Sequence, residues 1–285
     1  MARICEREIA ARFAERYRAA EAAVAREIEL AVIGGDWGAN GYTSGAQAGL
    51  LARLLELGPG VRLLDVGAGR GWPGLYLAAS TGCRVVLADV PVEGLVSAIA
   101  RAVREQLSGR AVAAAASARR LPFRPAVFDA IVHTDVLCCL RPKLSVLREC
   151  RRVLRPGGRT AFFTIHPAAG LSPAQRRRAS RDGPVAVATA RPYRQMLESA
   201  GFAEVHERDC TSEFATVARA WIGQWDDHRA DLVSVFGEQA VQERQADRRA
   251  ELRAIEDGVL SRSLFTAVRP GPVRPGALPA TAARV

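Results

Sequence analysis

Three glycines at alternate positions directly follow a short apolar stretch that ends near a carboxylate. The glycines are Gly67, Gly69 and Gly71, and the carboxylate is Asp65. Glycine at such positions lets the chain turn tightly and lets a ligand lie against the backbone. A dinucleotide-binding fingerprint would need its third glycine at position 72, where this chain has Trp72. A pyrophosphate would be repelled by Asp65, so the pattern favours a ligand that carries an ammonium group.

Further polar residues follow the next predicted strands. The stretch Arg84 to Asp89 is a second apolar strand that ends in an acid, and a carboxylate there can accept both hydroxyls of a ribose. Asp135 follows the strand that begins at Phe128, and His166 follows the strand over 160–165. Because ligands in open α/β sheets bind beyond the carboxyl ends of the strands, we expect these side chains at one site. His166 titrates near neutral pH when unperturbed, so it is the preferred proton acceptor. His133, within its strand, is expected to point into the fold.

This order of motifs resembles the class I S-adenosylmethionine-dependent methyltransferases. The resemblance lies with their small-molecule branch, which includes methyltransferase type 11 and the ubiquinone-biosynthesis methyltransferases. Two further stretches carry it: Leu121-Pro122-Phe123 after a strand of small residues, and Leu154-Arg155-Pro156-Gly157-Gly158 between a helix and a hydrophobic strand. It covers about Tyr42 to Ala203. The resemblance implies S-adenosylmethionine as the cofactor.

The cofactor-binding residues that the resemblance implies come from the glycine loop, the ends of the strands and the segment before the sheet. They are Asp65, Gly67, Ala68, Gly69, Gly71, Asp89, Val90, Ser117, Ala118, Asp135 and Tyr42. Ser117 stands where the family usually has Asp, which weakens or replaces a contact to the adenine. Tyr42 either reaches the sulfonium end of the cofactor or only packs. Asp135 faces either the methionine ammonium or the substrate, so it is a catalytic candidate beside His166.

The expected fold is α/β, a doubly wound Rossmann-like sheet of seven strands with N-terminal helices and a helical insertion before the last strand. We expect an N-terminal helical cap over 1–58, the methyltransferase domain over 59–268, and a disordered tail over 269–285, which is rich in proline and glycine. The sixth and seventh strands are expected over Ala203–Asp209 and Leu260–Val268.

Helical segments flank this core. One amphipathic helix is expected from Ile4 to Val32, ended by glycines, and Ser44 is expected to cap the next helix. The insertion, about 212–257, carries Trp221 and Trp225 on one stripe. That stripe indicates either a lid or apolar substrate wall, or an added helical layer or dimer contact.

Composition limits the partners. The chain has 285 residues, 49% of them hydrophobic, and a formal net charge of +10. Lys143 is the only lysine among 40 basic residues, and the arginine clusters are dispersed without interleaved aromatic residues, so nucleic acid is an unlikely ligand. The six cysteines lack zinc-ligand spacing, which predicts reduced thiols and no metal. The absence of a long apolar run and of a signal-peptide pattern predicts a cytoplasmic protein without a membrane span.

The sequence therefore predicts an S-adenosylmethionine-dependent methyltransferase that acts on a small molecule, a secondary metabolite by preference, with oxygen as the favoured acceptor. One alternative is a catalyst of the cyclase type that binds the same cofactor on the same fold without transferring methyl. A second alternative is an RNA methyltransferase, whose binding would weaken steeply with salt. The acceptor atom and a homodimeric state are left open by the sequence.

Overall fold

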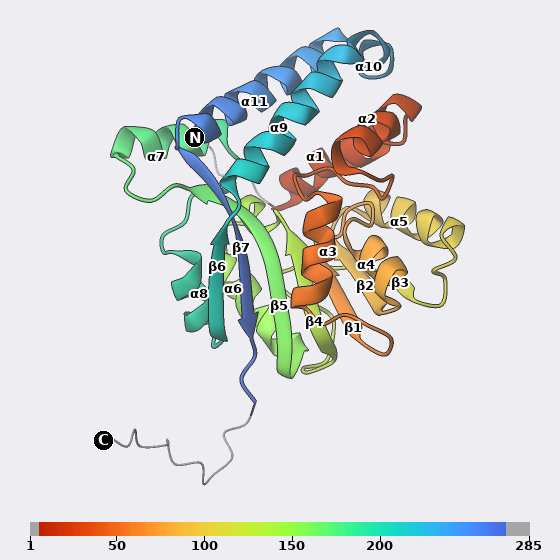
Figure 1. Ribbon diagram of the computed structural model, residues 1–285, viewed down its shortest axis with the longest axis vertical. Coiled ribbons are helices and arrows are strands. Elements are labelled where there is room, and N and C mark those ends of the chain that lie inside the picture. The colour runs from red at the N-terminus through yellow and green to blue at the C-terminus, as the bar shows by residue number, and fades with distance from the viewer. Residues whose placement is uncertain (1–5, 272–285) are drawn as a thin grey trace.

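The structure is a computed structural model that describes residues 6–271. A seven-stranded sheet with the order β3-β2-β1-β4-β5-β7-β6 forms its centre (Figure 1). Only β7 runs antiparallel to its neighbours β5 and β6. The strands are β1 (Arg62–Val66), β2 (Arg84–Asp89), β3 (Ala111–Ala115), β4 (Phe128–Thr134), β5 (Leu154–Pro167), β6 (Ala203–Asp209) and β7 (Leu260–Val268). The predicted Rossmann-like seven-stranded sheet is confirmed.

Helices cover both faces of the sheet and its upper edge in Figure 1. They are α1 (Glu6–Ala19), α2 (Ala23–Ile33), α3 (Gly45–Leu54), α4 (Gly74–Thr81), α5 (Val92–Arg104), η1 (Leu137–Cys139), α6 (Lys143–Val153), α7 (Pro173–Asp182), α8 (Tyr193–Ser199), α9 (Thr211–Asp227), α10 (Arg229–Phe236) and α11 (Glu238–Glu256). One face packs on α3, α4 and α5, and the other face packs on α6 and α8. The central strands are buried on both sides, which explains their continuous apolar sequences.

The first predicted helix is wrong in one respect, because two helices replace it. The chain turns at residues 20–22, and Ala22 has an extended backbone (ψ 145°). The two parts pack on different surfaces: α1 lies against α5, whereas α2 lies against α9. Gly34, in the left-handed conformation (φ 89°), ends α2 as predicted. Ser44 caps α3 as predicted, and it does so with Gln47 in a capping box.

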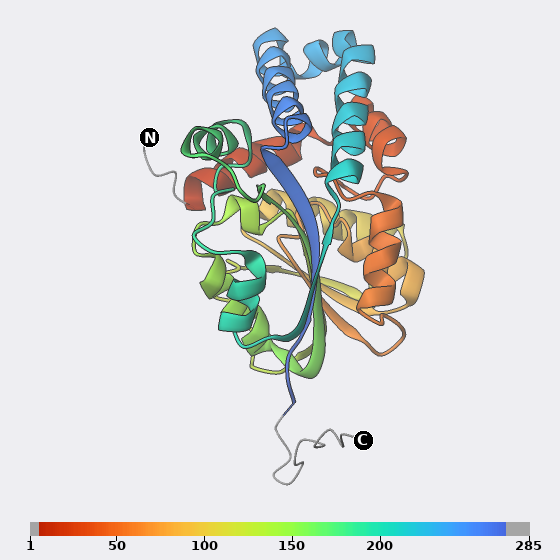
Figure 2. The ribbon, with the colours of Figure 1, turned by 60° about the vertical axis from the view of Figure 1, so that its left-hand side comes forward.

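The insertion between β6 and β7 forms three helices, α9, α10 and α11, which rise above the ends of the parallel strands (Figures 1 and 2). Together with α2 they make a helical cap, and we use "cap" for α2 and α9–α11 below. Trp221 and Trp225 face the inside of the cap and are buried among Ile28, Leu232 and Val241. Trp72, which stands in place of a third glycine, belongs to the same cluster, so the glycine loop and the cap share one core.

Two further segments differ from expectation. The polar, arginine-rich stretch before Arg181, for which no helix was predicted, includes the helix α7 with a complete capping box at Ser172. Strand β5 begins at Leu154, earlier than expected, because Gly157 and Gly158 pair with the Arg269 backbone beyond β7. Most of the predicted disordered tail, from residue 272 onward, lies outside the described residues.

Candidate cofactor site and polar centre under the cap

The glycine loop leaves β1 with all three glycines in conformations that favour glycine. Gly67, Gly69 and Gly71 have φ values of 72°, 52° and 111°. A Cβ atom on Gly67 would lie 2.3 Å from a methyl group of Val136, so the loop and the segment after β4 approach closely. The loop therefore offers bare backbone at the edge where β1 and β4 end.

Asp65 lies under this loop. One carboxylate oxygen, Oδ2, accepts a hydrogen bond from the Gly74 backbone N–H (2.9 Å), at the start of α4. The other oxygen, Oδ1, is buried and has no hydrogen-bond partner within residues 6–271. Burial raises the pKa of Asp65 well above its usual range. An unpartnered buried acceptor at this position suits a ligand that brings a positively charged donor.

Asp89 lies at the end of β2 as predicted and faces the loop. Its oxygens accept from the backbone N–H groups of Gly69 (2.8 Å) and Val90 (2.7 Å). Burial raises its pKa to about 6. The Tyr17 hydroxyl of α1 also donates to this carboxylate, a contact that the sequence analysis did not anticipate.

Helix α1 is fastened over the glycine loop by side chains on both sides of Tyr17. A Cβ on Gly69 would lie only 2.9 Å from the Tyr17 hydroxyl, so the phenol rests on the loop. Arg18 pairs with Glu93 (3.1 Å), and Glu21 accepts from Arg70 (3.2 Å) and from Ser97. The N-terminal helix thus covers the acid that the sequence assigns to a ribose.

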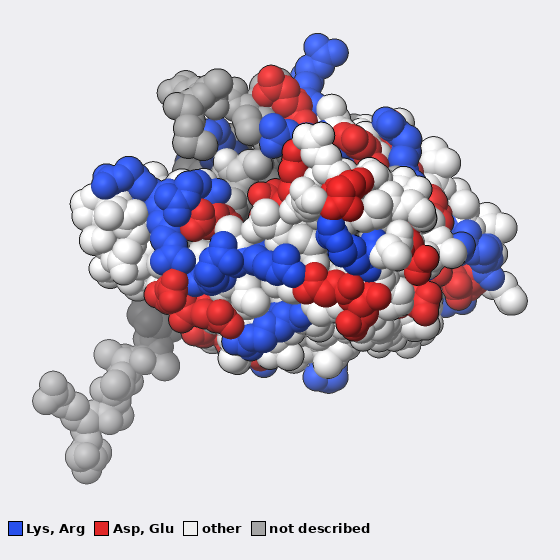
Figure 3. Space-filling model, turned by 90° about the horizontal axis from the view of Figure 1, so that it is seen from above, with Lys and Arg blue, Asp and Glu red and all other residues white. Residues whose placement is uncertain are grey.

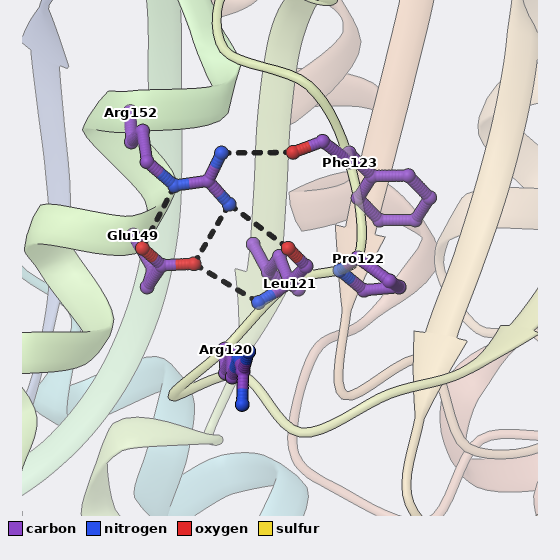
Figure 4. Close-up of a pocket in the computed structure, with 6 residues that line it drawn as sticks. All are labelled: Arg120, Leu121, Pro122, Phe123, Glu149 and Arg152. Carbon is purple, nitrogen blue, oxygen red and sulfur yellow. Dashed lines mark hydrogen bonds and ion pairs between the residues drawn. The ribbon is translucent and has the colours of Figure 1, made fainter.

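The loop after β3 is held in place by α6. The Arg152 guanidinium donates to the carbonyl oxygens of Leu121 (2.9 Å) and Phe123 (2.8 Å), and Glu149 accepts from the Leu121 N–H (3.0 Å), as Figure 4 shows. The side chains around these bonds line an open depression of about 650 Å³. Ala118 is buried beside this loop. None of the residues lining the depression belongs to the glycine loop, so we do not assign it to the cofactor.

Asp135 is bound on both oxygens by Arg262 of β7, at 2.9 and 2.8 Å. The Arg262 side chain is fully buried and also donates to Thr43 Oγ1 (2.7 Å) and Gln47 Oε1 (3.1 Å). Asp135 itself has a left-handed backbone (φ 55°). The sequence analysis missed Arg262, although a lone arginine inside an apolar strand is the signal that would have found it.

Tyr42 turns toward the cap. Its ring packs edge-on against Phe214 of α9 (4.6 Å between centroids), and its hydroxyl donates to Glu251 of α11. Burial raises the pKa of Glu251 to about 7 and raises that of Tyr42 well above its usual range. The charge of Asp135 also raises the pKa of Glu251, whereas the charge of Arg248 lowers it. Tyr42 therefore joins the segment before α3 to the last helix of the cap.

His166 lies at the end of β5, opposite Ser261 of β7. Its Nδ1 lies 3.0 Å from the Pro167 carbonyl oxygen, and its Nε2 lies 2.9 Å from the Ser263 hydroxyl. Since a carbonyl only accepts, Nδ1 carries the proton in the neutral ring and Nε2 accepts from Ser263. His133 points into the fold as predicted: it is buried, stacks on Phe162 (4.2 Å), and burial lowers its pKa to about 3.

The site residues named from the sequence fall into two groups. Asp65, Asp89 and the glycine loop meet at the ends of β1 and β2, whereas Asp135 and Tyr42 take part in a polar centre under the cap. This polar centre, as we use the term, comprises Tyr42, Thr43, Gln47, Asp135, Glu251 and Arg262. Ser117 accepts from the Arg119 N–H (3.2 Å) in the loop after β3.

The surface around the cap mixes both signs of charge. Figure 3 shows basic and acidic side chains interleaved over the face seen from above. No helix among the described residues is long and apolar enough to cross a membrane. Within residues 6–271, no group of three or more His, Cys, Asp or Glu side chains is placed to hold a metal ion.

Comparison with known proteins identifies the class of domain. Residues 64–162 match the family described as a methyltransferase domain. A 27-O-demethylrifamycin SV methyltransferase from Amycolatopsis mediterranei (strain S699) is 35% identical over 155 residues, 53% of this chain and 57% of that protein. The chain spans about half the length, or less, of the first curated relatives it matches. Residues 64–162 thus belong to a methyltransferase domain, which agrees with the predicted resemblance to class I S-adenosylmethionine-dependent methyltransferases.

Two solved structures share the fold over most of the chain. A phosphoethanolamine N-methyltransferase 2 from Haemonchus contortus has a TM-score of 0.77 at 19% identity and covers 94% of this chain and 61% of its own. The cyclase SpnF has a TM-score of 0.71 at 23% identity and covers 92% of this chain and 97% of its own. Both likenesses therefore extend well beyond residues 64–162, over which the methyltransferase domain matches.

Proposed function

We propose that this protein transfers a methyl group from S-adenosylmethionine to a small-molecule acceptor. The observation that carries the proposal is the orphaned Asp65 oxygen beneath a loop of three left-handed glycines, with Asp89 at the next strand end. An ammonium group and a ribose are the donors that these two carboxylates suit. When bound, the cofactor supplies a methyl group on a sulfonium, already activated for attack.

The residues of this chain bind, orient and accept a proton. Asp65 and the backbone of Gly67, Ala68, Gly69 and Gly71 would hold the methionine end, and Asp89 with Val90 would hold the ribose. Ser117 and Ala118 would border the adenine. Asp135 and Tyr42 would close the methionine side, where Asp135 is fixed by Arg262.

His166 is the proposed proton acceptor. Its Nδ1–H is directed at the Pro167 carbonyl, which fixes the ring in the tautomer whose Nε2 is basic. A methyl acceptor would take the place of the Ser263 hydroxyl at Nε2. Oxygen is the favoured acceptor atom, supported by the name of the rifamycin relative; relatives named for N-methylation and C-methylation keep the other atoms as outcomes of the test.

The second candidate is a cyclase that binds the same cofactor without consuming it. The specific observation in its favour is the length over which SpnF and this chain share one fold, 97% of SpnF.

We also propose a cytoplasmic protein, supported by the free cysteines among residues 6–271, and a homodimer, supported by exposed valines such as Val92, Val96 and Val103 on α5.

The experiment incubates the protein with methyl-labelled S-adenosylmethionine and a metabolite extract, then locates the label and measures S-adenosylhomocysteine. Label in a small molecule with matching S-adenosylhomocysteine is expected, whereas a converted substrate without S-adenosylhomocysteine indicates the cyclase. Label in RNA, with binding that falls steeply as salt rises, indicates the third alternative.

Two variants test the assigned roles. Asp89→Ala removes two charge-assisted hydrogen bonds, each worth about 1.5–3 kcal/mol, and calorimetry should show correspondingly weaker S-adenosylmethionine binding. Unchanged affinity would refute the ribose assignment. His166→Ala should lower turnover by about two to four orders of magnitude with cofactor affinity kept. Loss of cofactor affinity in His166→Ala would instead make this histidine structural.

A further inference from the structure

A small cavity of about 30 Å³ lies between the cap and the glycine loop. Its wall includes three arginines and two tryptophans, Arg70, Arg244, Arg248, Trp221 and Trp225, beside Asn40 and Glu29. Arg70 comes from the glycine loop, the tryptophans come from α9, and the other two arginines come from α11. The cavity holds roughly one or two water molecules, so it suits the head of a polar group and not a whole metabolite.

Two of the arginines that line this cavity each have a guanidinium nitrogen without a partner. Arg70 Nη2 and Arg248 Nη1 are buried and make no hydrogen bond within the described part of the chain. The Arg70 side chain is almost completely buried, and its other nitrogens reach Glu21 (3.2 Å) and Glu29 (3.6 Å). A buried donor left unsatisfied is costly, and two beside one cavity indicate an acceptor that both of them share.

The one carboxylate in the cavity wall, Glu29, already accepts hydrogen bonds from the backbone. Glu29 Oε1 accepts from the backbone N–H groups of Trp37 (2.9 Å), Gly38 (2.6 Å) and Ala39 (2.8 Å). The wall contains three arginines and this one glutamate, and Glu21 outside the wall also pairs with Arg70, so Arg244 and Arg248 have no carboxylate partner in the wall. Positive charge in the wall of a cavity attracts an anion.

Arg244 and Arg248 lie one turn apart on α11 and stack on the cap tryptophans. Their Cζ atoms lie 5.1 and 4.3 Å from the centre of the Trp225 ring. Neither makes an ion pair with a carboxylate among residues 6–271. Burial lowers the pKa of Arg244 to about 9 and that of Arg248 to about 10. Like charges at this spacing on a helix repel, and a shared anion would remove the repulsion.

We propose that this cavity binds the oxyanion, a carboxylate or phosphoryl group, of the small-molecule substrate. The inference rests on the proposed function and adds a substrate class to it: an anionic acceptor. Guanidinium groups match the geometry of both oxyanions, because each presents a planar fork of N–H donors. Trp221 and Trp225 would then border the part of the substrate next to the anion.

A second oxyanion with the same hydrogen-bonding chemistry is the carboxylate of the cofactor. It is also an oxyanion near the glycine loop, to which Arg70 belongs. The two sources differ in what an arginine variant does to cofactor affinity, so the experiment measures inorganic phosphate and S-adenosylhomocysteine separately.

The first measurement is thermal unfolding with inorganic phosphate against chloride at equal ionic strength. Phosphate should raise the unfolding temperature of the wild type by about 2–4 °C near saturation. Arg248→Met keeps a long side chain on the tryptophans but removes the charge, and it should abolish the shift. Arg253→Met, an exposed arginine of the same helix, is the matched control and should keep it.

The second measurement is calorimetry with S-adenosylhomocysteine. Its affinity for Arg248→Met should stay within about twofold of the wild type. An equal phosphate shift in Arg248→Met and the wild type would overturn the site, and so would a loss of cofactor affinity of about tenfold, which would assign the arginines to the cofactor. Absence of S-adenosylhomocysteine binding in the wild type, with the phosphate effect intact, would contradict the proposed function alone.

Tryptophan fluorescence of the wild type tests the proposal even if Arg248→Met does not fold. Trp221 and Trp225 border the cavity, so phosphate should change the tryptophan fluorescence of the wild type with the same midpoint as the thermal shift. A fluorescence signal that does not respond to phosphate would overturn the proposal.

Discussion

The glycine loop and the polar centre under the cap are built in opposite ways. The loop presents backbone at consecutive positions, and its two acids are fixed by the N–H groups of Gly69 and Gly74. The polar centre presents side chains from four distant segments, and Arg262 alone joins Asp135 to Thr43 and Gln47. The first kind of site depends on local conformation, whereas the second depends on tertiary packing.

This difference decides how each region responds to change. Removing a side chain from the loop leaves the backbone donors in place, so ligand binding changes more than folding. Removing a side chain from the polar centre leaves a buried charge without its partner, so folding changes first. The predictions below test that division, from the largest expected effect to the smallest.

The largest effect is expected for Arg262→Met. The substitution leaves the Asp135 carboxylate buried without its partner, and it should lower the free energy of unfolding by about 3–5 kcal/mol. Urea denaturation followed by circular dichroism measures the loss. Arg159→Met is the matched control, because Arg159 pairs with Glu56 at the surface and should cost at most about 1 kcal/mol. Equal costs for the two variants would contradict the role given to the polar centre.

Glu251→Gln should change how stability depends on pH. The folded pKa of Glu251, about 7, lies above its unfolded value, so the folded state holds a proton that the unfolded state has released between these values. Its stabilising contribution is complete below about pH 4.3 and is lost as the pH rises through 7.

The amide of Glu251→Gln stays neutral, so this variant should gain about 1–3 kcal/mol over the wild type between pH 4.5 and 8. Unfolding curves at several pH values measure the gain. Glu256→Gln, at the exposed end of the same helix, loses only a surface ion pair with Arg219 and should stay within about 1 kcal/mol of the wild type at every pH. Parallel curves for Glu251→Gln and the wild type would show that burial does not keep the Glu251 carboxyl protonated in the folded state.

The smallest effect is expected at the glycine loop for Tyr17→Phe. The phenol donates to the carboxylate assigned to the ribose, so a ligand must displace it. Losing that one hydrogen bond, about 0.5–1.5 kcal/mol, should tighten S-adenosylhomocysteine binding by roughly two- to tenfold in calorimetry. Tyr76→Phe, which packs on Trp37 and Trp72, should leave the affinity unchanged. Weaker binding in Tyr17→Phe would mean that the phenol contacts the ligand.

Most of the fold was predictable because parallel strands and glycine turns leave local signals. The bounds of β2, β6 and β7 agree with the expected ranges, the helix after Ser44 begins where its cap predicts, and the helix before Gly34 ends where its cap predicts. The break between α1 and α2 was not predictable, since the apolar period runs through it and only packing on α5 and α9 separates the halves. The helix α7 was missed because it has almost no apolar stripe.

The residues of the candidate site were likewise predictable only where a local sequence motif marks them. Asp65 and Asp89 were found because Asp65 directly precedes the glycine loop and Asp89 ends the next strand. Tyr17, Arg262 and Glu251 were missed, because their partners lie far away in the sequence and no local motif relates them. Of these three residues, Arg262 is the one with a local signal in the sequence, because it is an arginine within the apolar seventh strand.

The helices α9–α11 leave the sheet and return to it at a single point. The Cys210 N–H donates to the Arg262 carbonyl (2.8 Å), and the Arg262 N–H donates to Thr211 Oγ1 (3.2 Å), so the two ends of the excursion are hydrogen-bonded to each other. The entropic cost of closing such a segment changes only slowly with its length. The sheet register therefore does not depend on the length of the excursion, whereas the glycine loop does depend on its shape, because Trp72 packs in the same core as Trp221 and Trp225.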